Sequence, residues 1–213
     1  MRLPLLGAVI AIALLAGCAG PSVTPGPSPA ATPVAPAVVE QAPAHFTVDF
    51  DTSTGPVVVA IETKDAPIGA QRFYELVKAH YFDGARFFRV VPGFVVQFGI
   101  AGDPALTKKW DVAIKDDPVT KRNARGTVVF AATDQPNSRT TQLFINLGPN
   151  GRLDSLGFAP IGQVVSGMEN VDKIDSEYGE APDQDKITDK GNEYLQSEFP
   201  KLDYIKTARL KSE

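Results

Sequence analysis

Eight short apolar runs, each bounded by turn residues, constrain the fold more than any other feature of the sequence. They lie at residues 45–51, 56–62, 86–91, 95–99, 127–132, 142–146, 160–165 and 203–210. Their alternating or continuous apolar character over such short lengths is typical of β-strands. No βαβ rhythm joins them, which favours antiparallel pairing. Eight strands just fill the interior of a barrel, and closure leaves no exposed edge. We therefore expect a mainly β fold, a closed eight-stranded antiparallel barrel.

Two helices are expected to cap this barrel. The first starts near Asp65, whose carboxylate is a good helix N-cap, and Pro67 is tolerated in its first turn. It carries one apolar stripe made of Ala70, Phe73, Val77 and Tyr81. The second helix is expected at residues 168–176. A short extra helix is expected within residues 187–200, and the sequence assigns no function to it.

The segment of residues 19–44 cannot join the barrel core. Seven of its 26 residues are proline and most of the others are small. Such a composition favours extended polyproline II segments and a passive linker. We therefore divide the chain into residues 1–17 as a signal peptide, 18–44 as a disordered Pro/Ala-rich tether, and 45–213 as the folded domain.

The first residues have the composition of a secretory signal. Arg2 supplies a positive charge, and the apolar run at residues 5–15 is too short to span a membrane comfortably. The alternative, a buried helix of the fold, is disfavoured by the proline-rich stretch that follows. The end of the run, Leu15-Ala16-Gly17-Cys18, resembles the lipobox of bacterial lipoproteins. That resemblance implies cleavage before Cys18, its acylation, and stable anchoring by several acyl chains.

These features predict a lipid-anchored protein of the bacterial cell envelope. In lipoproteins of bacteria with two membranes, a residue other than Asp after the cysteine implies the outer membrane. Ala19 occupies that position here. We therefore expect the domain to face the periplasm in such a bacterium, with the lipid anchor as its sole contact with the membrane.

Composition and charge exclude several classes of function. The chain has 21 basic and 25 acidic residues and a net charge of −4, so nucleic acid is not an expected partner. Cys18 is the single cysteine, which leaves the folded domain without a disulfide or thiol nucleophile. His45 and His80 have no partners at metal-ligand spacing, so we expect no metal and no cofactor. Nothing in the sequence demands more than a monomer.

Several polar segments are interpreted as ordinary loops. Ser138, Thr140 and Thr141 have no base placed to activate them as nucleophiles. The charged residues 115–117 and the segment 177–190 are expected to be solvated.

The stretch FFRVVPGFVVQFG, residues 87–99, predicts a hairpin around Pro92 and Gly93. A three-residue loop places Arg89 directly opposite Gln97 on one face, whereas a two-residue loop places them on opposite faces. The first register would set a guanidinium and a carboxamide among apolar side chains, where a charge must be paired or functional. A surface arginine on an ordinary hairpin is the alternative.

This stretch resembles the signature of cyclophilins, Phe-His-Arg followed by two hydrophobic residues, Pro-Gly-Phe, and a Gln-Gly-Gly end. The resemblance implies that Arg89 is the catalytic arginine and that Phe94 contacts the substrate proline. It also implies that Gln97 holds the substrate backbone and that Val95, in place of a methionine, lines the same pocket.

Two further blocks extend the resemblance to about residues 46–210. NARGTVVFAAT with NSRTTQLFIN, and GRLDSLGFAPIGQVVSGM, resemble the second and third blocks of cyclophilins. By the same resemblance, the remaining substrate-binding residues are Ala132, Thr133, Gln142, Phe144, Leu153 and Phe158.

The resemblance implies a peptidyl-prolyl cis-trans isomerase that acts on Pro-containing polypeptides without covalent chemistry. An X–Pro bond rotates over a barrier of ~18–20 kcal/mol, and a twisted amide stabilised by Arg89 would lower it. The chain departs from the family pattern at Phe98 and at Arg152, which stands where an aromatic residue is usual. Arg152 argues against tight cyclosporin binding. These departures leave open a non-catalytic module that grips proline segments or acts as a chaperone in the envelope. A hollow small-ligand barrel is a third alternative.

Overall fold

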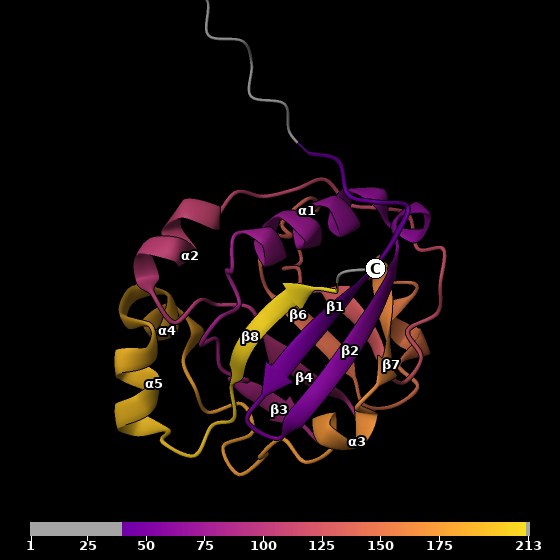
Figure 1. Cartoon of the computed structure of the whole chain (residues 1–213). Coiled ribbons are helices and arrows are strands. Elements are labelled where there is room, and N and C mark those ends of the chain that lie inside the picture. Colours follow the sequence, from indigo (N-terminus) through magenta and orange to yellow (C-terminus); the bar gives the residue numbers. More distant parts are fainter. Residues whose placement is uncertain (1–39, 212–213) are drawn as a thin grey trace, which may run out of the picture. The chain divides into compact units, whose positions relative to one another are not determined.

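The computed structural model describes residues 40–211 of the chain (Figure 1). The predicted signal peptide, Cys18 and the tether as far as residue 39 lie outside the described residues. Within residues 40–211 there are eight strands, each at or within a few residues of a predicted run. They are β1 (His45–Thr52), β2 (Gly55–Glu62), β3 (Arg89–Val91), β4 (Val95–Phe98), β5 (Thr127–Phe130), β6 (Leu143–Asn146), β7 (Pro160–Ser166) and β8 (Ile205–Leu210).

All eight strands belong to one antiparallel sheet in the order β3-β4-β6-β5-β7-β2-β1-β8. The sheet is a curled half-barrel with β3 and β8 as its edges, so the predicted closure is not observed. Between these edges the ladder is replaced by an isolated bridge from Arg86 to Tyr204. The N–H of Phe87 donates to Asp203 O at 3.0 Å, but the N–H of Val90 turns to Gly179 O at 3.0 Å. β3 therefore pairs with a loop where closure would require β8.

The interior of the curled sheet is filled with aromatic rings. Phe50 lies 6.1 Å from Phe98, and Phe82 lies 5.7 Å from Phe98, measured between ring centroids. The space left among the core side chains around Phe50 and Phe98 is only about 10 Å³. A small-ligand barrel needs a hollow interior, so this packing argues against that alternative.

Helix α1 (Pro67–Lys78) lies across one end of the curled sheet and contacts β7 and β8 (Figure 1). Its predicted apolar stripe is buried as expected. The predicted cap is wrong, because no side chain of the neighbouring residues caps the helix. The carboxylate of Asp117 instead accepts hydrogen bonds from the N–H groups of Ile68 and Gly69, at 2.9 and 2.8 Å. Asp117 is buried, so part of the predicted solvated loop belongs to the core.

The remaining helices are short. They are η1 (Thr63–Asp65), α2 (Pro104–Trp110), η2 (Gly151–Leu153), α3 (Met168–Val171), α4 (Gln184–Lys190) and α5 (Asn192–Glu198). The expected C-terminal helix is thus two helices, α2 was not predicted, and α3 covers four residues of the predicted range 168–176. None of the helices within residues 40–211 combines the length and apolar character that crossing a membrane requires.

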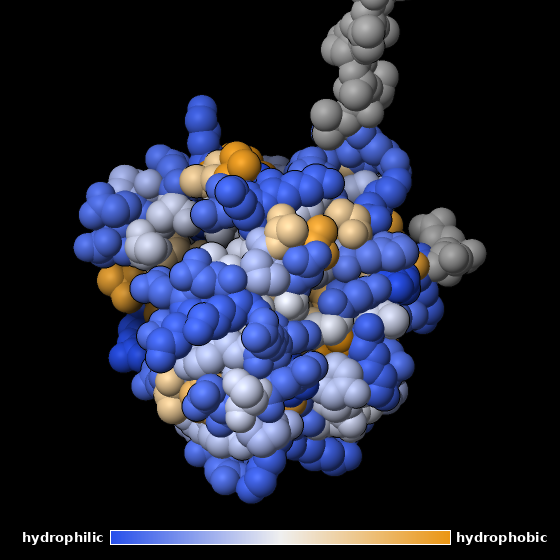
Figure 2. Space-filling view, turned by 90° about the vertical axis from the view of Figure 1, so that its left-hand side faces the viewer, coloured by the Kyte–Doolittle hydropathy of each residue, from blue (hydrophilic) through white to orange (hydrophobic). Residues whose placement is uncertain are grey.

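Helices α2, α4 and α5 gather on one side of the sheet, where α4 contacts both α2 and α5 (Figure 1). A second, smaller core lies beneath them. It joins buried residues of the hairpin region to α4 and α5, and consists of Phe88, Ile100, Ile187, Leu195 and Leu202. The outer face of these helices is mostly hydrophilic (Figure 2). The C-terminal helices therefore form an addition that is packed firmly beside the edge strand β3.

Candidate active site

The β3–β4 hairpin positions the first part of the site. Arg89 pairs with Gln97, and Val91 pairs with Val95, which leaves residues 92–94 as a three-residue loop. Of the two registers that the sequence allowed, the structure therefore has the one that sets Arg89 opposite Gln97. Gly93 has a φ of +72°, a left-handed conformation that glycine adopts without a Cβ clash. Pro92 and Gly93 thus set the loop that brings Arg89 and Gln97 to the same face.

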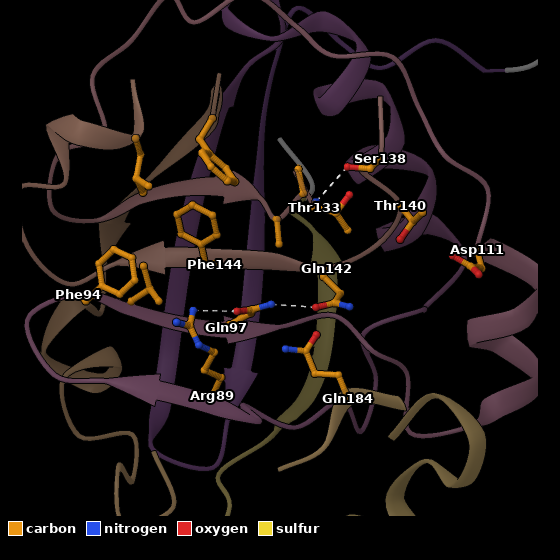
Figure 3. Close-up of a pocket in the computed structure, with 15 residues that line it drawn as sticks. Arg89, Phe94, Gln97, Asp111, Thr133, Ser138, Thr140, Gln142, Phe144 and Gln184 are labelled. Atoms are coloured by element: carbon orange, nitrogen blue, oxygen red, sulfur yellow. Dashed lines mark hydrogen bonds between the residues drawn. The ribbon is translucent and has the colours of Figure 1, made fainter. Parts of the chain in front are cut away.

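A row of three side chains runs along the groove floor (Figure 3). Arg89 donates from Nη1 to Gln97 Oε1 at 3.2 Å, and Gln97 donates from Nε2 to Gln142 Oε1 at 2.8 Å. The second bond fixes which end of the Gln97 carboxamide faces Arg89, because a carboxamide has one acceptor and one donor end. The guanidinium is therefore held by a chain of hydrogen bonds that runs from β3 through β4 to the residue before β6.

The end of the groove beside Arg89 is lined by apolar side chains. Val95, Phe144 and Leu153 are buried, and they pack with the partly buried Phe94 and Phe158. The rings of Phe144 and Phe158 lie edge to face with centroids 5.9 Å apart. This end is a slot of rings and aliphatic groups open on one side, a shape suited to a small apolar ring.

The guanidinium groups of Arg89 and Arg152 both lie near the ring of Phe94. Their Cζ atoms are 5.7 and 4.7 Å from its centroid, within the range of cation–π attraction. Arg152, which stands where the resemblance leads us to expect an aromatic residue, therefore contacts the same ring as Arg89.

The opposite end of the groove is polar (Figure 3). There the N–H of Thr133 donates to Ser138 Oγ at 3.0 Å. The groove has a volume of about 520 Å³ and contains every predicted catalytic and substrate-binding residue, from Arg89 to Phe158. Its lining also includes residues that were not among those predicted, namely Asp111, Ala131, Ser138, Thr140 and Gln184.

The unpredicted residues reach the groove from distant segments. Asp111 follows α2 and Gln184 begins α4. The packing of these two helices against the groove cannot be predicted from local sequence patterns. Glu180 was also missed: its Oε1 lies 2.6 Å from Arg89 Nε and 2.5 Å from Nη2. The predicted solvated loop at residues 177–190 therefore supplies a direct partner of Arg89.

Buried carboxamides support the groove from behind. Asn150 donates to Phe94 O at 2.8 Å and to Asn146 Oδ1 at 2.6 Å. Asn123 donates to Phe158 O and to Asp154 Oδ1, both at 2.8 Å. Since buried polar groups must find partners, this network fixes the backbone that carries Phe94 and Phe158. Within residues 40–211, no cluster of three His, Cys, Asp or Glu side chains could hold a metal ion.

Fold and groove together define the class of protein as a cyclophilin-like half-barrel with a guanidinium beside a ring-lined slot. Residues 47–192 match the family described as "Cyclophilin type peptidyl-prolyl cis-trans isomerase/CLD". The chain belongs to the cyclophilin-type peptidyl-prolyl cis-trans isomerase family.

Curated relatives agree with this assignment. The chain is 37% identical over 128 residues to peptidyl-prolyl cis-trans isomerase A of Dickeya dadantii, covering 58% of this chain and 67% of that protein. It is 32% identical over 136 residues to peptidyl-prolyl cis-trans isomerase B of Escherichia coli, covering 60% of this chain and 82% of that protein.

A solved structure shares the fold. The cyclophilin-type peptidyl-prolyl cis-trans isomerase of Cryptosporidium parvum matches with a TM-score of 0.60 and 18% identity, over 79% of this chain and 99% of that one. The same protein has been solved in the presence of the dipeptide Ala-Pro.

Proposed function

We propose that this peptidyl-prolyl cis-trans isomerase accelerates X–Pro rotation by gripping the proline ring and donating hydrogen bonds from Arg89 to the twisted amide. Twisting removes the double-bond character of the C–N bond and leaves a lone pair on a pyramidal nitrogen. A permanently charged fork of donors stabilises that nitrogen without forming or breaking a covalent bond.

The apolar slot supplies the second half of the mechanism. The rings of Phe94, Phe144 and Phe158 would hold the pyrrolidine ring and exclude water, which strengthens the hydrogen bonds from Arg89. Gln97 would orient the substrate backbone and the guanidinium together. Lowering the barrier by about 7 kcal/mol corresponds to roughly 10⁵-fold acceleration.

One observation carries this proposal: Arg89 lies beside the apolar, ring-lined end of a groove of about 520 Å³, in a chain of the isomerase family. The test is a proline-isomerisation assay on the full-length chain and on the variant Arg89→Ala. We expect the variant to lose about 100-fold in kcat/KM, the scale of losing one preorganised donor group. Circular dichroism should show an unchanged fold. A folded variant with full turnover would contradict the role of Arg89.

We further propose that the enzyme is a lipid-anchored monomer of the cell envelope. The lipobox-like Leu15-Ala16-Gly17-Cys18 and the proline-rich segment after it support this location. Its clients would be Pro-containing segments of exported proteins, reached across the tether. The net charge of −4 gives no basis for binding nucleic acid.

A further inference from the structure

The hydrogen-bond donors of Arg89 are divided between two acceptors. Glu180 Oε1 accepts from Nε at 2.6 Å and lies 2.5 Å from Nη2, while Gln97 Oε1 accepts from Nη1 at 3.2 Å. A guanidinium has five N–H groups in one plane. The two acceptors hold different edges of it. Among residues 40–211, no further acceptor takes the second N–H of Nη1 and of Nη2, and these two remain for a substrate.

The backbone next to Glu180 is attached to the edge strand that carries Arg89. Gly179 O accepts a hydrogen bond from the N–H of Val90 at 3.0 Å. The segment is itself a tight turn, because the N–H of Gly179 donates to Ser176 O at 3.0 Å. Gly179 has a φ of +54°, a conformation that glycine adopts readily. Glu180 is therefore aimed at Arg89 by a bond between neighbouring backbones.

The same segment is anchored from below by the second core. The ring of Tyr178 lies edge to face with that of Phe199 at 5.2 Å, and both pack against the second core. Phe88, which precedes Arg89, belongs to this core as well. The helices α4 and α5 thus pack the turn that carries Glu180 against the hairpin that carries Arg89. In this way they contribute to the geometry of the groove.

A carboxylate beside a catalytic cation has two opposed effects, since it fixes the cation and also neutralises it. The side chain of Glu180 is 60% exposed and that of Arg89 is 26% exposed, so solvent screens the neutralisation. An exposed ion pair changes an equilibrium by less than about fivefold. Misplacing a catalytic group by about 1 Å costs up to about 100-fold in rate. Fixing the guanidinium is therefore the larger effect.

We propose that Glu180 is a positioning residue for the isomerase reaction, which holds the Nε edge of Arg89 so that its free N–H groups face the substrate amide. This inference rests on the proposed role of Arg89. It predicts that loss of the acceptor lowers kcat more than it changes KM, because the groove that binds the proline ring stays intact.

The test compares Glu180→Ala, Glu180→Gln and Glu177→Ala in the full-length chain, with kcat and KM measured on an Ala-Pro peptide. Glu177 is the matched control, an acid of the same loop that pairs with Lys201 at 2.6 Å. We expect Glu180→Ala to lose about tenfold in kcat with KM changed by less than about twofold. Glu180→Gln should stay within about threefold of wild type, since its carboxamide oxygen still accepts from Nε. Glu177→Ala should match wild type.

A nuclear magnetic resonance signal supplies a second readout that a purely structural role would not move. The Nε–H proton of Arg89 should exchange with solvent faster in Glu180→Ala than in wild type and Glu177→Ala. Wild-type kcat in Glu180→Ala, an equal loss in Glu180→Gln or Glu177→Ala, or unchanged Nε–H exchange would each overturn the proposal. If Arg89→Ala were inactive while Glu180→Ala kept full turnover, only the role of Glu180 would fail. Full turnover in Arg89→Ala would instead remove the proposed mechanism.

Discussion

Arg89 and Arg139 show two uses of a guanidinium in one protein. Arg89 keeps donors for the groove, whereas Arg139 is buried and both of its terminal nitrogens donate to groups of the protein. Its Nη1 lies 3.0 Å from Asp117 Oδ2, and its Nη2 donates to Lys115 O. Because Asp117 also accepts from the first N–H groups of α1, the pair joins that helix to the loop leading to Gln142.

Breaking this buried pair is predicted to be costly. Asp117→Ala leaves a buried cation without its main partner and α1 without its cap, so we expect unfolding in urea to require about 3–5 kcal/mol less free energy. Asp116→Ala is the control, because Asp116 lies 3.3 Å from Arg139 Nε but is 41% exposed. It should cost less than about 1 kcal/mol. Equal losses in the two variants would contradict this account.

At the scale of single residues, prediction succeeded where partners are close in sequence. Arg89 and Gln97 are eight residues apart, and the residues of their hairpin loop determine the register. Asp117 accepts from Gly69, 48 residues away, and Glu180 accepts from Arg89, 91 residues away. No local pattern carries such pairings, so both acids were interpreted as solvated loop residues.

The segment around η2 (Gly151–Leu153) is the element that carries the rim of the groove. Asp154, which follows it, accepts hydrogen bonds from the side chain and the backbone of Asn123, each at 2.8 Å. These bonds hold the pKa of Asp154 below its ordinary value; the bond from the Asn123 side chain has the larger effect and the bond from its backbone the smaller one. Since Asn123 also donates to Phe158 O, we expect protonation of Asp154 to loosen the rim.

This arrangement predicts a defined pH dependence of stability. A carboxyl whose pKa is lower in the folded state stabilises the fold above its unfolded pKa of about 3.9 and ceases to do so as pH falls through the folded value. The difference in unfolding free energy between wild type and Asp154→Asn should be constant above about pH 5 and shrink towards pH 2. Denaturant unfolding at several pH values measures it. A difference independent of pH would refute the role of Asp154.

Elements were predictable in proportion to their length and regularity. The strands follow alternation and turn residues, which act locally. Helix α2 has only seven residues, too few for periodicity, although Asp103 accepts from the N–H of Ala105 and Pro104 follows it. In the predicted helix at 168–176, Met168, Val171 and Ile174 recur every three residues. After α3 the backbone continues in tight turns, and the N–H of Ile174 donates to Val171 O at 3.2 Å. A hydrogen bond between residues three apart is typical of a 3₁₀ conformation.

At the scale of the whole molecule, the predicted membrane tether makes location separable from catalysis. Cys18→Ser removes the proposed acylation site and leaves the groove residues unchanged. We expect wild type to sediment with membranes and the variant to stay in the soluble fraction, with equal kcat/KM in the isomerisation assay. Mass spectrometry of the wild-type chain should find acyl groups on Cys18. A variant that still sediments with membranes would contradict the lipid anchor.

The predicted closure of the sheet concerned the whole molecule. It was wrong because a loop near Gly179 takes the hydrogen bond that closure would need at the edge strand. Strand count alone favours a barrel without edges. In the chain, the C-terminal turn at Gly179 occupies the N–H of Val90 on the edge strand β3. The sheet thus stays open where the second core attaches, and that attachment brings Glu180 to Arg89.

The most direct test of the central claim separates binding from turnover in one sample. Exchange spectra of an Ala-Pro peptide are recorded with a substoichiometric amount of wild type or of Arg89→Lys, which keeps the charge but loses the fork of donors. Wild type should produce exchange peaks between cis and trans peptide. Arg89→Lys should still shift the resonances of Phe94 and Phe144 on binding the peptide but lose most of the exchange. Undiminished exchange with Arg89→Lys, or peptide-induced shifts outside the groove, would contradict the account.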